Sequence, residues 1–387
     1  MNEGIKQETI HQSPLIKLHH RRGAALVERD GRLEPLSYGD IFGDVLAEYA
    51  AVRDGGAGLI DLSSRGRVEV SGAEAVQFLN GLITNDVKAL EDNSWMPAAF
   101  PNVQGRLLAS VRVVRRGDSF LFDTEPATHA SVLKNLERFT LAGDFRVRDV
   151  THETACLSVQ GKDAAHVVVA TLGEAAASIP QRKALGLSWQ GADVTVMRAT
   201  HTAEDGFDVI VGANEAPRLW EALMEAGARP VGFAALEILR VEAGVPHYGV
   251  DMNETNVVLE AALDEAVSYT KGCYIGQEII ARIHWRGHVA KRLTGLILDE
   301  DEATQVPLGS KIKTPDGKEI GRVTSLTFSP RLKHEVALGY VKYDYLTPGT
   351  DVLIITEDGE RAARVAEVPM VRGSWLTESN GAEGETA

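Results

Sequence analysis

The chain has 387 residues, more than one ordinary hydrophobic core contains, so its length indicates two or three domains. Apolar residues make up 44% of it and charged residues 25%, as in globular proteins that fold in water. The formal net charge of −15 argues against a protein that coats nucleic acid or an anionic membrane over a broad surface. A local basic patch is still compatible with this charge.

The cysteines and the N-terminus indicate where the protein works. Two cysteines, Cys156 and Cys273, are too few for a disulfide scaffold, so we expect a reducing compartment. There is no CxxC or HExxH motif, and we predict no metal site; His19 and His20 are interpreted as solvated side chains. The N-terminus has no apolar run typical of a signal peptide, and no stretch approaches the ~18 apolar residues of a membrane span. We therefore expect a cytoplasmic protein without membrane contact, or a mitochondrial matrix protein if the source is eukaryotic.

Helix and strand signals alternate along the first three quarters of the chain. Apolar spacing and glycine stops predict helices over residues 40–53, 71–81, 127–139, 161–173, 216–226 and 233–243. Short β-rich runs predict strands over residues 67–70, 107–114, 119–123, 157–159, 194–199 and 207–211. These strands alternate polar and apolar residues, which favours an α+β fold with antiparallel sheets over a buried parallel sheet.

The pattern changes at about Lys291, where short β runs follow Pro-Asp-Gly and Pro-Gly turns. Regular short strands of this kind predict a small antiparallel barrel or sandwich. The last residues are polar and rich in Gly and Glu, as in disordered tails. The predicted parts are a flexible arm (1–22), a first α+β unit (23–150), a second α+β unit (151–290), a C-terminal antiparallel β-barrel (291–375) and a disordered tail (376–387).

Several segments, taken in order, resemble one known superfamily. They are LIDLS (59–63), VSGAEAVQFLNGLITNDV (70–87), NVQGRLLAS (102–110), EDGFDVIV (204–211), GFAALEILRVEAGVPHYGVDM (232–252) and KGCYIGQE (271–278) followed by ARIHWRGHVAKRL (281–293). This set is similar to the folate-binding superfamily that contains the glycine-cleavage T-protein, an aminomethyltransferase. The KGCYIGQE signature is similar to its YgfZ branch, whose members are folate-binding proteins linked to iron–sulfur enzymes and to some tRNA modification. The resemblance implies two α+β units around a channel for tetrahydrofolate or another reduced folate, closed by a C-terminal β-barrel.

Cys273 and Lys271 are the candidate catalytic residues. A short helix over residues 276–283 would place Cys273 just before a helix N-terminus, where partial positive charge favours a thiolate. Lys271 would add to this effect, whereas Glu278 would oppose it. From the residues alone, a structural cysteine packed in a glycine-permitted turn is the preferred interpretation, and the resemblance reverses this preference in favour of a functional thiol.

A basic run follows this motif and consists of Arg282, Arg286, Lys291 and Arg292, with Trp285 inside it. Such a run could hold the polyglutamate tail of a folate, a phosphate or an RNA partner. A solvated, charge-balanced surface is the other interpretation.

The resemblance implies further folate-binding residues. Glu204 matches the T-protein segment that presents a carboxylate to the pterin ring, although Thr202-Ala203 departs from the family's Tyr-Thr-Gly. Arg240 borders the implied channel and could bind a carboxylate, or it could form an intrahelical ion pair with Glu237. Further candidates are Asn102, which begins the NVQGRLLAS match, and Asp61 and Asn85, which are interpreted first as cap or turn residues that hold the channel walls.

The resemblance also indicates a loss. The T-protein carries two aspartates after its Asn-x-x-Gly-Gly segment, the first of them implicated in catalysis, and Ala109 and Ser110 stand at the matching positions. Neither residue can manage the proton that aminomethyl transfer requires. We therefore do not expect an active glycine-cleavage aminomethyltransferase.

Three hypotheses follow. The first is a tetrahydrofolate-binding protein that supports the assembly or repair of iron–sulfur enzymes through Cys273, with those enzymes or their assembly factors as partners. The second is a folate-dependent aminomethyltransferase or demethylase-type one-carbon transferase whose acid comes from elsewhere, such as Asp86 or Glu204. The third is a module that docks tRNA or a partner enzyme through the basic run of residues 282–292.

Overall fold

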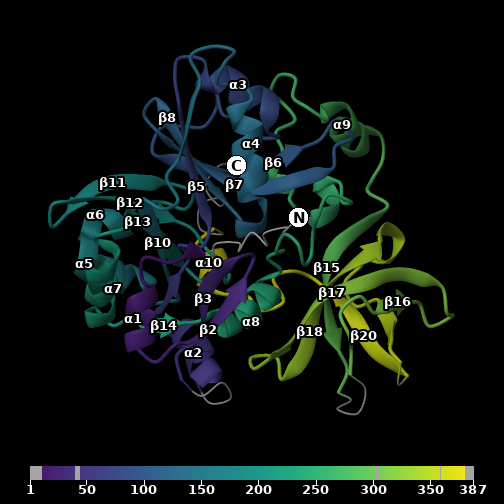
Figure 1. The fold of residues 1–387 in the computed structure, drawn as a ribbon. Coiled ribbons are helices and arrows are strands. Elements are labelled where there is room, and N and C mark those ends of the chain that lie inside the picture. Colours follow the sequence, from purple (N-terminus) through teal and green to yellow (C-terminus); the bar gives the residue numbers. More distant parts are fainter. Residues whose placement is uncertain (1–10, 40–43, 301–304, 358, 380–387) are drawn as a thin grey trace, which may run out of the picture.

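The computed structural model describes residues 11–39, 44–300, 305–357 and 359–379. Two sheet-containing lobes lie one above the other, and a β-barrel lies beside them (Figure 1). Within the described residues, no helix is long and apolar enough to cross a membrane. The α+β fold with its antiparallel C-terminal barrel is confirmed.

The first lobe is built on a five-stranded antiparallel sheet in the order β6-β7-β8-β5-β9. Its strands are β5 (Gly66–Ser71), β6 (Ser94–Pro101), β7 (Leu107–Arg116), β8 (Ser119–Thr124) and β9 (Arg146–Asp149). One face packs against α3 (Ala75–Leu82) and α4 (His129–Glu137) around an apolar core that includes Leu79, Leu136 and Phe122. Period-two alternation along β7 buries Ala109 and Val111 in this core and turns Ser110 to the other face.

The second lobe is built on a six-stranded sheet in the order β11-β12-β13-β10-β4-β14. Its strands are β4 (Gly58–Asp61), β10 (Thr154–Gln160), β11 (Ala184–Trp189), β12 (Ala192–Arg198), β13 (Gly206–Gly212) and β14 (Arg229–Val231). The helices of this lobe are α5 (Ala164–Leu172), α6 (Glu174–Ala177) and α7 (Ala216–Glu225).

Strand β4 corrects the expected division at residue 150. It precedes the whole first sheet in the chain, yet it pairs with β10 on one side and with β14 on the other. All four of its residues are buried. The backbone N–H and C=O groups of a buried strand need hydrogen-bond partners at both edges, and β10 and β14 of the second sheet supply them.

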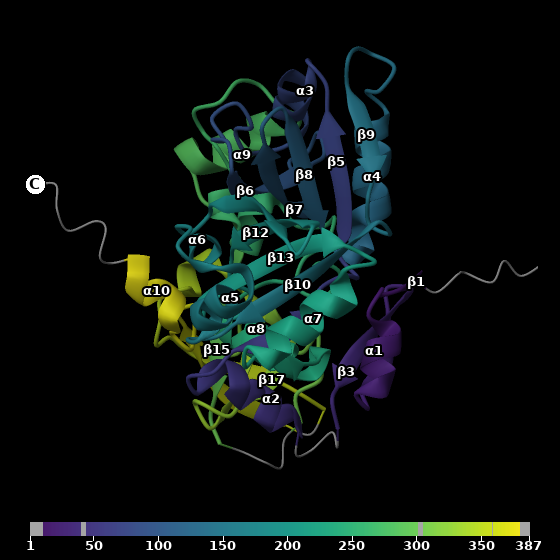
Figure 2. The same ribbon diagram turned by 90° about the vertical axis from the view of Figure 1, so that its left-hand side faces the viewer.

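The N-terminal segment corrects the expected flexible arm. Residues 1–10 lie outside the described part, but residues 11–37 form β1 (His11–Gln12), α1 (Ile16–Arg21), β2 (Ala25–Arg29) and β3 (Arg32–Ser37). The three strands pair as one small sheet, which lies together with α1 in Figure 2. Leu15, Leu18 and His19 are buried, so apolar burial anchors this segment, and His19 is not a solvated side chain.

Helix α8 packs against barrel strands β17 and β18, and α2 packs against α8. The prediction over residues 233–243 is confirmed by α8 (Phe233–Ala243), which ends where Gly244 adopts the left-handed conformation (φ 73°). The described part of the predicted 40–53 helix is α2 (Asp44–Arg53), and residues 40–43 lie outside the described part. Shorter helices follow at η1 (Pro126–Thr128), η2 (Val258–Ala261), η3 (Asp264–Ala266), α9 (Gln277–Arg286) and η4 (Tyr343–Tyr345).

The C-terminal part is a closed six-stranded antiparallel barrel. Its strands are β15 (Lys291–Leu298), β16 (Lys311–Lys313), β17 (Glu319–Ser329), β18 (His334–Lys342), β19 (Asp351–Ile355) and β20 (Glu360–Ala366). The chain then leaves the barrel and returns to the body, where Met370 N donates to Glu242 O at 2.8 Å. The expected tail therefore begins inside a helix, α10 (Ser374–Ser379), and residues 380–387 lie outside the described part.

Candidate functional site

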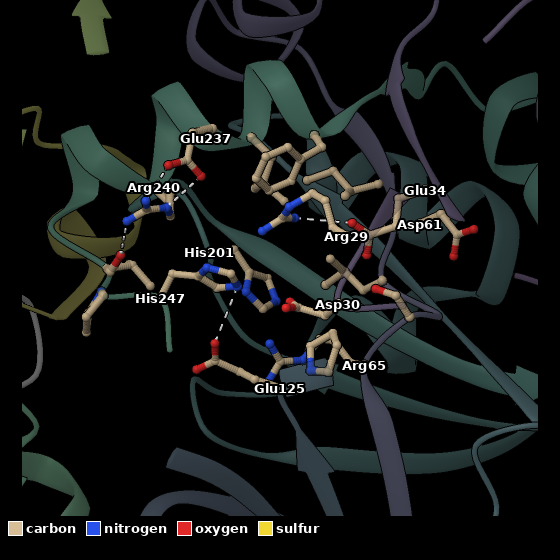
Figure 3. Close-up of a pocket in the computed structure, with 18 of the residues that line it drawn as sticks. Arg29, Asp30, Glu34, Asp61, Arg65, Glu125, His201, Glu237, Arg240 and His247 are labelled. Atoms are coloured by element: carbon tan, nitrogen blue, oxygen red, sulfur yellow. Dashed lines mark hydrogen bonds and ion pairs between the residues drawn. The ribbon is translucent and has the colours of Figure 1, made fainter. Parts of the chain in front are cut away.

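A cavity of about 250 Å³ lies between the two lobes, the hairpin formed by β2 and β3, and α8. Its wall combines an apolar surface with a charged one (Figure 3). The apolar surface includes Ile60, Leu62, Val231, Phe233, Leu236 and Met252. The charged surface includes Arg29, Asp30, Glu34, Asp61, Arg65, Arg112, Glu125, Glu237 and Arg240.

A chain of five hydrogen-bonded side chains connects the first lobe to the second. We call it the Arg112 network, and it consists of Arg65, Arg112, Asp123, His201 and Asp208. Asp123 accepts hydrogen bonds from Arg65 Nε at 2.8 Å and from Arg112 Nε at 2.7 Å. Arg112 Nη1 also donates to Asp208 Oδ2 at 2.6 Å, and His201 Nε2 lies 3.0 Å from the same oxygen. Burial opposes ionisation of Asp208, but His201 and Arg112 hold its pKa well below its usual range. The charged side chains of this network therefore connect strands β7, β8 and β13 through ion pairs.

Asp61, a predicted folate-binding residue, lines the cavity but is already bonded. Its Oδ2 lies 2.8 Å from His19 Nε2 and accepts a hydrogen bond from Ser13 Oγ, and its Oδ1 accepts one from Ser63 N at 2.9 Å. Burial opposes ionisation, but His19 and the two serines lower the pKa of Asp61. The carboxylate of Asp61 therefore bonds the N-terminal segment to β4, and no sequence pattern indicated His19 as its partner.

Arg240 lines the cavity and combines both interpretations offered for it. It donates to Glu237 Oε2 at 2.8 Å, which is the intrahelical pair, and also to Asp251 Oδ2 at 2.7 Å and Ser325 Oγ at 2.8 Å. Ser325 belongs to the barrel, so Arg240 also connects α8 to β17. Binding of a substrate carboxylate by Arg240 stays a prediction.

Glu125 and His247 form a different kind of corner, which the sequence analysis missed. Figure 3 shows the two side chains facing one another, and His247 Nε2 lies 3.6 Å from Glu125 Oε2. Glu125 Oε2 accepts a hydrogen bond from Tyr248 N at 2.9 Å, whereas Oε1 has no hydrogen-bond partner within the part of the chain that the structure describes. In the same described part, the buried His247 Nδ1 has no partner either. The position of Glu125 between the predicted strand 119–123 and Pro126 was the one available signal.

The environment of this corner favours uncharged side chains. Burial raises the pKa of Glu125, an effect that Arg65 opposes. Burial, together with the nearby Arg240 and Arg29, lowers the pKa of His247 to about 4. The imidazole of His247 is therefore neutral near neutral pH, and the carboxyl group of Glu125 holds its proton to a higher pH than an exposed glutamate does.

Glu204 is not among the residues that line the cavity. Arg53 Nη1 donates to its Oε1 at 3.0 Å, and both the backbone N and the Oγ of Ser374 donate to its Oε2, at 2.8 and 2.7 Å. The structure therefore brings the predicted pterin ligand to the C-terminal segment and not to the other candidates. The position of Glu204 in a turn before a strand agrees with the sequence pattern. The contact of this turn with Ser374 of the C-terminal segment was not predicted.

Asn102 and Asn85 also lie outside the cavity wall. Asn102 Oδ1 accepts from Gln104 N at 2.9 Å and from Arg106 N at 3.0 Å, and so caps the turn between β6 and β7. Asn85 Nδ2 donates to the carbonyls of Pro97 at 2.8 Å and Glu265 at 3.0 Å. The contacts of Asn85 match its interpretation as a turn residue, whereas the turn-capping role of Asn102 was not predicted.

Positions 109 and 110 differ in a way that the sequence did not reveal. Ala109 is 1% exposed within the apolar core, whereas Ser110 lines the cavity. A carboxylate at position 109 would be buried among apolar side chains, at high cost. The cavity-facing place of an acid on β7 is therefore position 110.

Cys273 lies on the surface, in the loop before α9, and carries a free thiol. The helix begins at Gln277, four residues further on. Lys271 is buried, and its Nζ donates to the carbonyls of Ile83 at 2.8 Å and Asn85 at 2.7 Å. Burial lowers the pKa of Lys271 to about 8. The ammonium group thus holds the 83–85 turn, and neither candidate lines the cavity.

Arg282 and Arg286 of the basic run are exposed on α9, whereas Lys291 and Arg292 are half-buried at the start of the barrel. Arg282 pairs with Glu278 one helical turn away, and Arg292 pairs with Asp264. Lys291 Nζ lies 5.0 Å from the Tyr340 ring, and Arg286 forms no ion pair within the described residues. Two of the four cations are therefore neutralised locally, and none lines the cavity.

Comparison with known proteins agrees with this architecture. Residues 15–271 match the GCVT N-terminal domain, and residues 291–371 match the glycine cleavage T-protein C-terminal barrel domain. An aminomethyltransferase of Rubrobacter xylanophilus is 32% identical over 98% of this chain and 99% of its own length. One of Geobacillus kaustophilus is 31% identical over 94% of this chain and 99% of its own length.

A solved structure is similar as well. The glycine cleavage system aminomethyltransferase T from Bartonella henselae superposes with a TM-score of 0.83 at 26% identity, covering 94% of this chain and 98% of that one. The aminomethyltransferase family binds tetrahydrofolate, as the resemblance implied. The chain belongs to the glycine cleavage T-protein family.

Proposed function

We propose that this chain is a folate-dependent one-carbon transferase of the aminomethyltransferase type, which works in the central cavity. The observation that carries the proposal is that cavity, because apolar side chains and a carboxyl group with an unbonded oxygen share its wall. The relatives named aminomethyltransferase, matched over almost their whole length, support it. It reverses the order of the first two hypotheses.

The residues present fit a reduced folate. The flat pterin ring system suits the apolar wall formed by Ile60, Phe233 and Leu236, because burying such a ring there removes apolar surface from water. The same wall carries a carboxyl oxygen with no hydrogen-bond partner in the described structure, Glu125 Oε1, which can exchange a proton with a bound substrate. The glutamate carboxylates of a folate call for a guanidinium such as that of Arg29. When bound, a reduced folate supplies the nitrogen that accepts the one-carbon unit.

The test is turnover. Purified protein under anaerobic conditions should bind tetrahydrofolate saturably in a calorimetric titration, and should form a one-carbon folate when an aminomethyl or methylated amine donor is added. Binding without any transfer, across a panel of such donors, would leave a folate-binding protein and refute the transferase. An absence of binding would refute both.

The YgfZ-type role in iron–sulfur enzyme maintenance is the second proposal. Its support is the KGCYIGQE motif and the exposure of Cys273, whose thiol other proteins can reach. Replacing Cys273 with serine should then lower iron–sulfur enzyme activity in cells while leaving folate transfer intact. Docking of tRNA through the basic run stays a prediction.

A further inference from the structure

Strands β7 and β8 place Glu125 beside the site of a missing acid. They pair antiparallel with Val111 opposite Thr124 and Arg112 opposite Asp123. One residue further, the same register sets Ser110 opposite Glu125. Directly opposite residues on one face of a sheet have Cβ atoms roughly 4.5–5.5 Å apart.

The two side chains share the cavity face. Ser110, Arg112 and Glu125 all line the cavity, while Ala109 and Val111 lie in the core on the other face. The resemblance leads one to expect carboxylates at positions 109 and 110, and this chain has none there. A carboxyl group is nevertheless present at the same place on the wall, supplied by the neighbouring strand.

We propose that Glu125, with His247 beside it, is the catalytic acid–base of this cavity and replaces across the strand pair the carboxylate absent from position 110. This inference rests on the proposed function. It differs from the sequence-based suggestions of Asp86 and Glu204, neither of which lines the cavity.

The geometry leaves one oxygen of Glu125 available for this task. Tyr248 N fixes Oε2, so the carboxyl group is oriented while Oε1 stays unbonded in the described structure. The charged and titratable groups that face Glu125 come from four places: Arg65 after β4, Asp123 on β8, Arg240 on α8 and His247 after it. Burial raises the pKa of Glu125 toward the range in which a carboxyl group can both give and take a proton, and His247 beside it is neutral.

In the proposed transfer step, Glu125 gives up one proton and takes up one proton. Its carboxyl proton passes to the leaving amine nitrogen as the carbon–nitrogen bond of the donor breaks, and the electron pair of that bond departs with the amine. The resulting carboxylate takes up the proton that the attacking folate nitrogen loses as its new bond to carbon forms. Glu125 is protonated again at the end of the step, and no oxidant or reductant is needed.

The decisive comparison is between wild type, Glu125→Gln and the double variant Ser110→Asp with Glu125→Gln. The glutamine can still accept the hydrogen bond from Tyr248 N, so folding should survive, and circular dichroism would verify this. Asp118→Asn is the matched control, because Asp118 is an exposed acid at the far end of the same hairpin.

We expect the transfer rate at saturating tetrahydrofolate to fall by about 100-fold or more in Glu125→Gln, within the usual range for a lost general acid–base. The calorimetric Kd for tetrahydrofolate should change by less than about threefold, since Arg29 and the apolar wall stay intact. The double variant should recover at least about tenfold of the rate, because its aspartate lies at the facing position. Asp118→Asn should behave as wild type.

A readout independent of turnover is the number of protons exchanged on folate binding, measured by calorimetry in two buffers of different ionisation enthalpy. Its dependence on pH should disappear in Glu125→Gln and return in the double variant. A wild type that transfers while Glu125→Gln transfers equally well would overturn the inference alone. A loss confined to folate affinity would make Glu125 a binding residue and overturn it too. A wild type that transfers nothing would remove the proposed function, and this role with it.

Discussion

The Arg112 network and the Glu125–His247 corner occupy the same wall of one cavity, yet they treat buried charge in opposite ways. In the network, the carboxylates of Asp123 and Asp208 each have cationic partners within hydrogen-bond distance. In the corner, one oxygen of Glu125 and one nitrogen of His247 have no partner in the described structure. Buried charges that are fully paired serve as a framework, whereas an oriented group with an unsatisfied atom can serve a ligand.

The largest effect should follow from breaking the network. Asp208→Asn removes the charge that Arg112 and His201 share, and it leaves the half-buried guanidinium with one carboxylate fewer. We expect the free energy of unfolding to fall by about 3–5 kcal/mol, the usual cost of removing one partner of a buried pair. Urea unfolding would measure it, with the exposed Asp193→Asn as control. A loss no larger than that of the control would show that the network is not structural.

A smaller effect is expected at Glu204, away from the cavity. Glu204→Gln weakens the pair with Arg53 and the bonds to Ser374, at a cost of about 1–3 kcal/mol in the free energy of unfolding. The calorimetric Kd for tetrahydrofolate should stay as in wild type, because Glu204 does not line the cavity. A folate affinity that falls tenfold without loss of stability would return Glu204 to the pterin site.

At the Glu125–His247 corner, Glu125→Gln should stabilise the folded protein, in contrast to Asp208→Asn and Glu204→Gln. The pKa of Glu125 is raised on folding, so ionisation of the buried carboxyl disfavours the folded state as pH rises above the ordinary value of about 4.5. Glu125→Gln lacks this cost, and its thermal midpoint should therefore exceed that of wild type at pH 8 and converge with it near pH 4.5. Below that pH both states of the wild type are protonated, and the difference should vanish. A midpoint lower than that of wild type at pH 8 would mean that Glu125 is a structural ion-pair partner.

Sequence patterns predicted the elements whose side chains repeat regularly. Helix α8, the start of the barrel at Lys291 and most strands of both lobes follow from periodicity and glycine stops, which act over a few residues. They could not show that β4 joins the second sheet or that the chain end returns to Glu204, because those contacts join positions 96 to 170 residues apart. Glu125 escaped notice for the same reason, since only the pairing of β7 with β8 brings it opposite Ser110.

Cys273, the most conspicuous residue of the sequence, should have the smallest effect on the folded protein. Its side chain is exposed, and Lys271, expected to polarise it, is bonded instead to the carbonyls of Ile83 and Asn85. Cys273→Ser should change the free energy of unfolding by no more than about 0.5 kcal/mol, as surface substitutions usually do, and should leave folate transfer unchanged. Cys156→Ser is the contrasting control, because that thiol is buried and should not tolerate the added polarity. A transfer rate that falls in Cys273→Ser but recovers with added thiol would show that the Cys273 loop takes part in folate transfer together with the cavity.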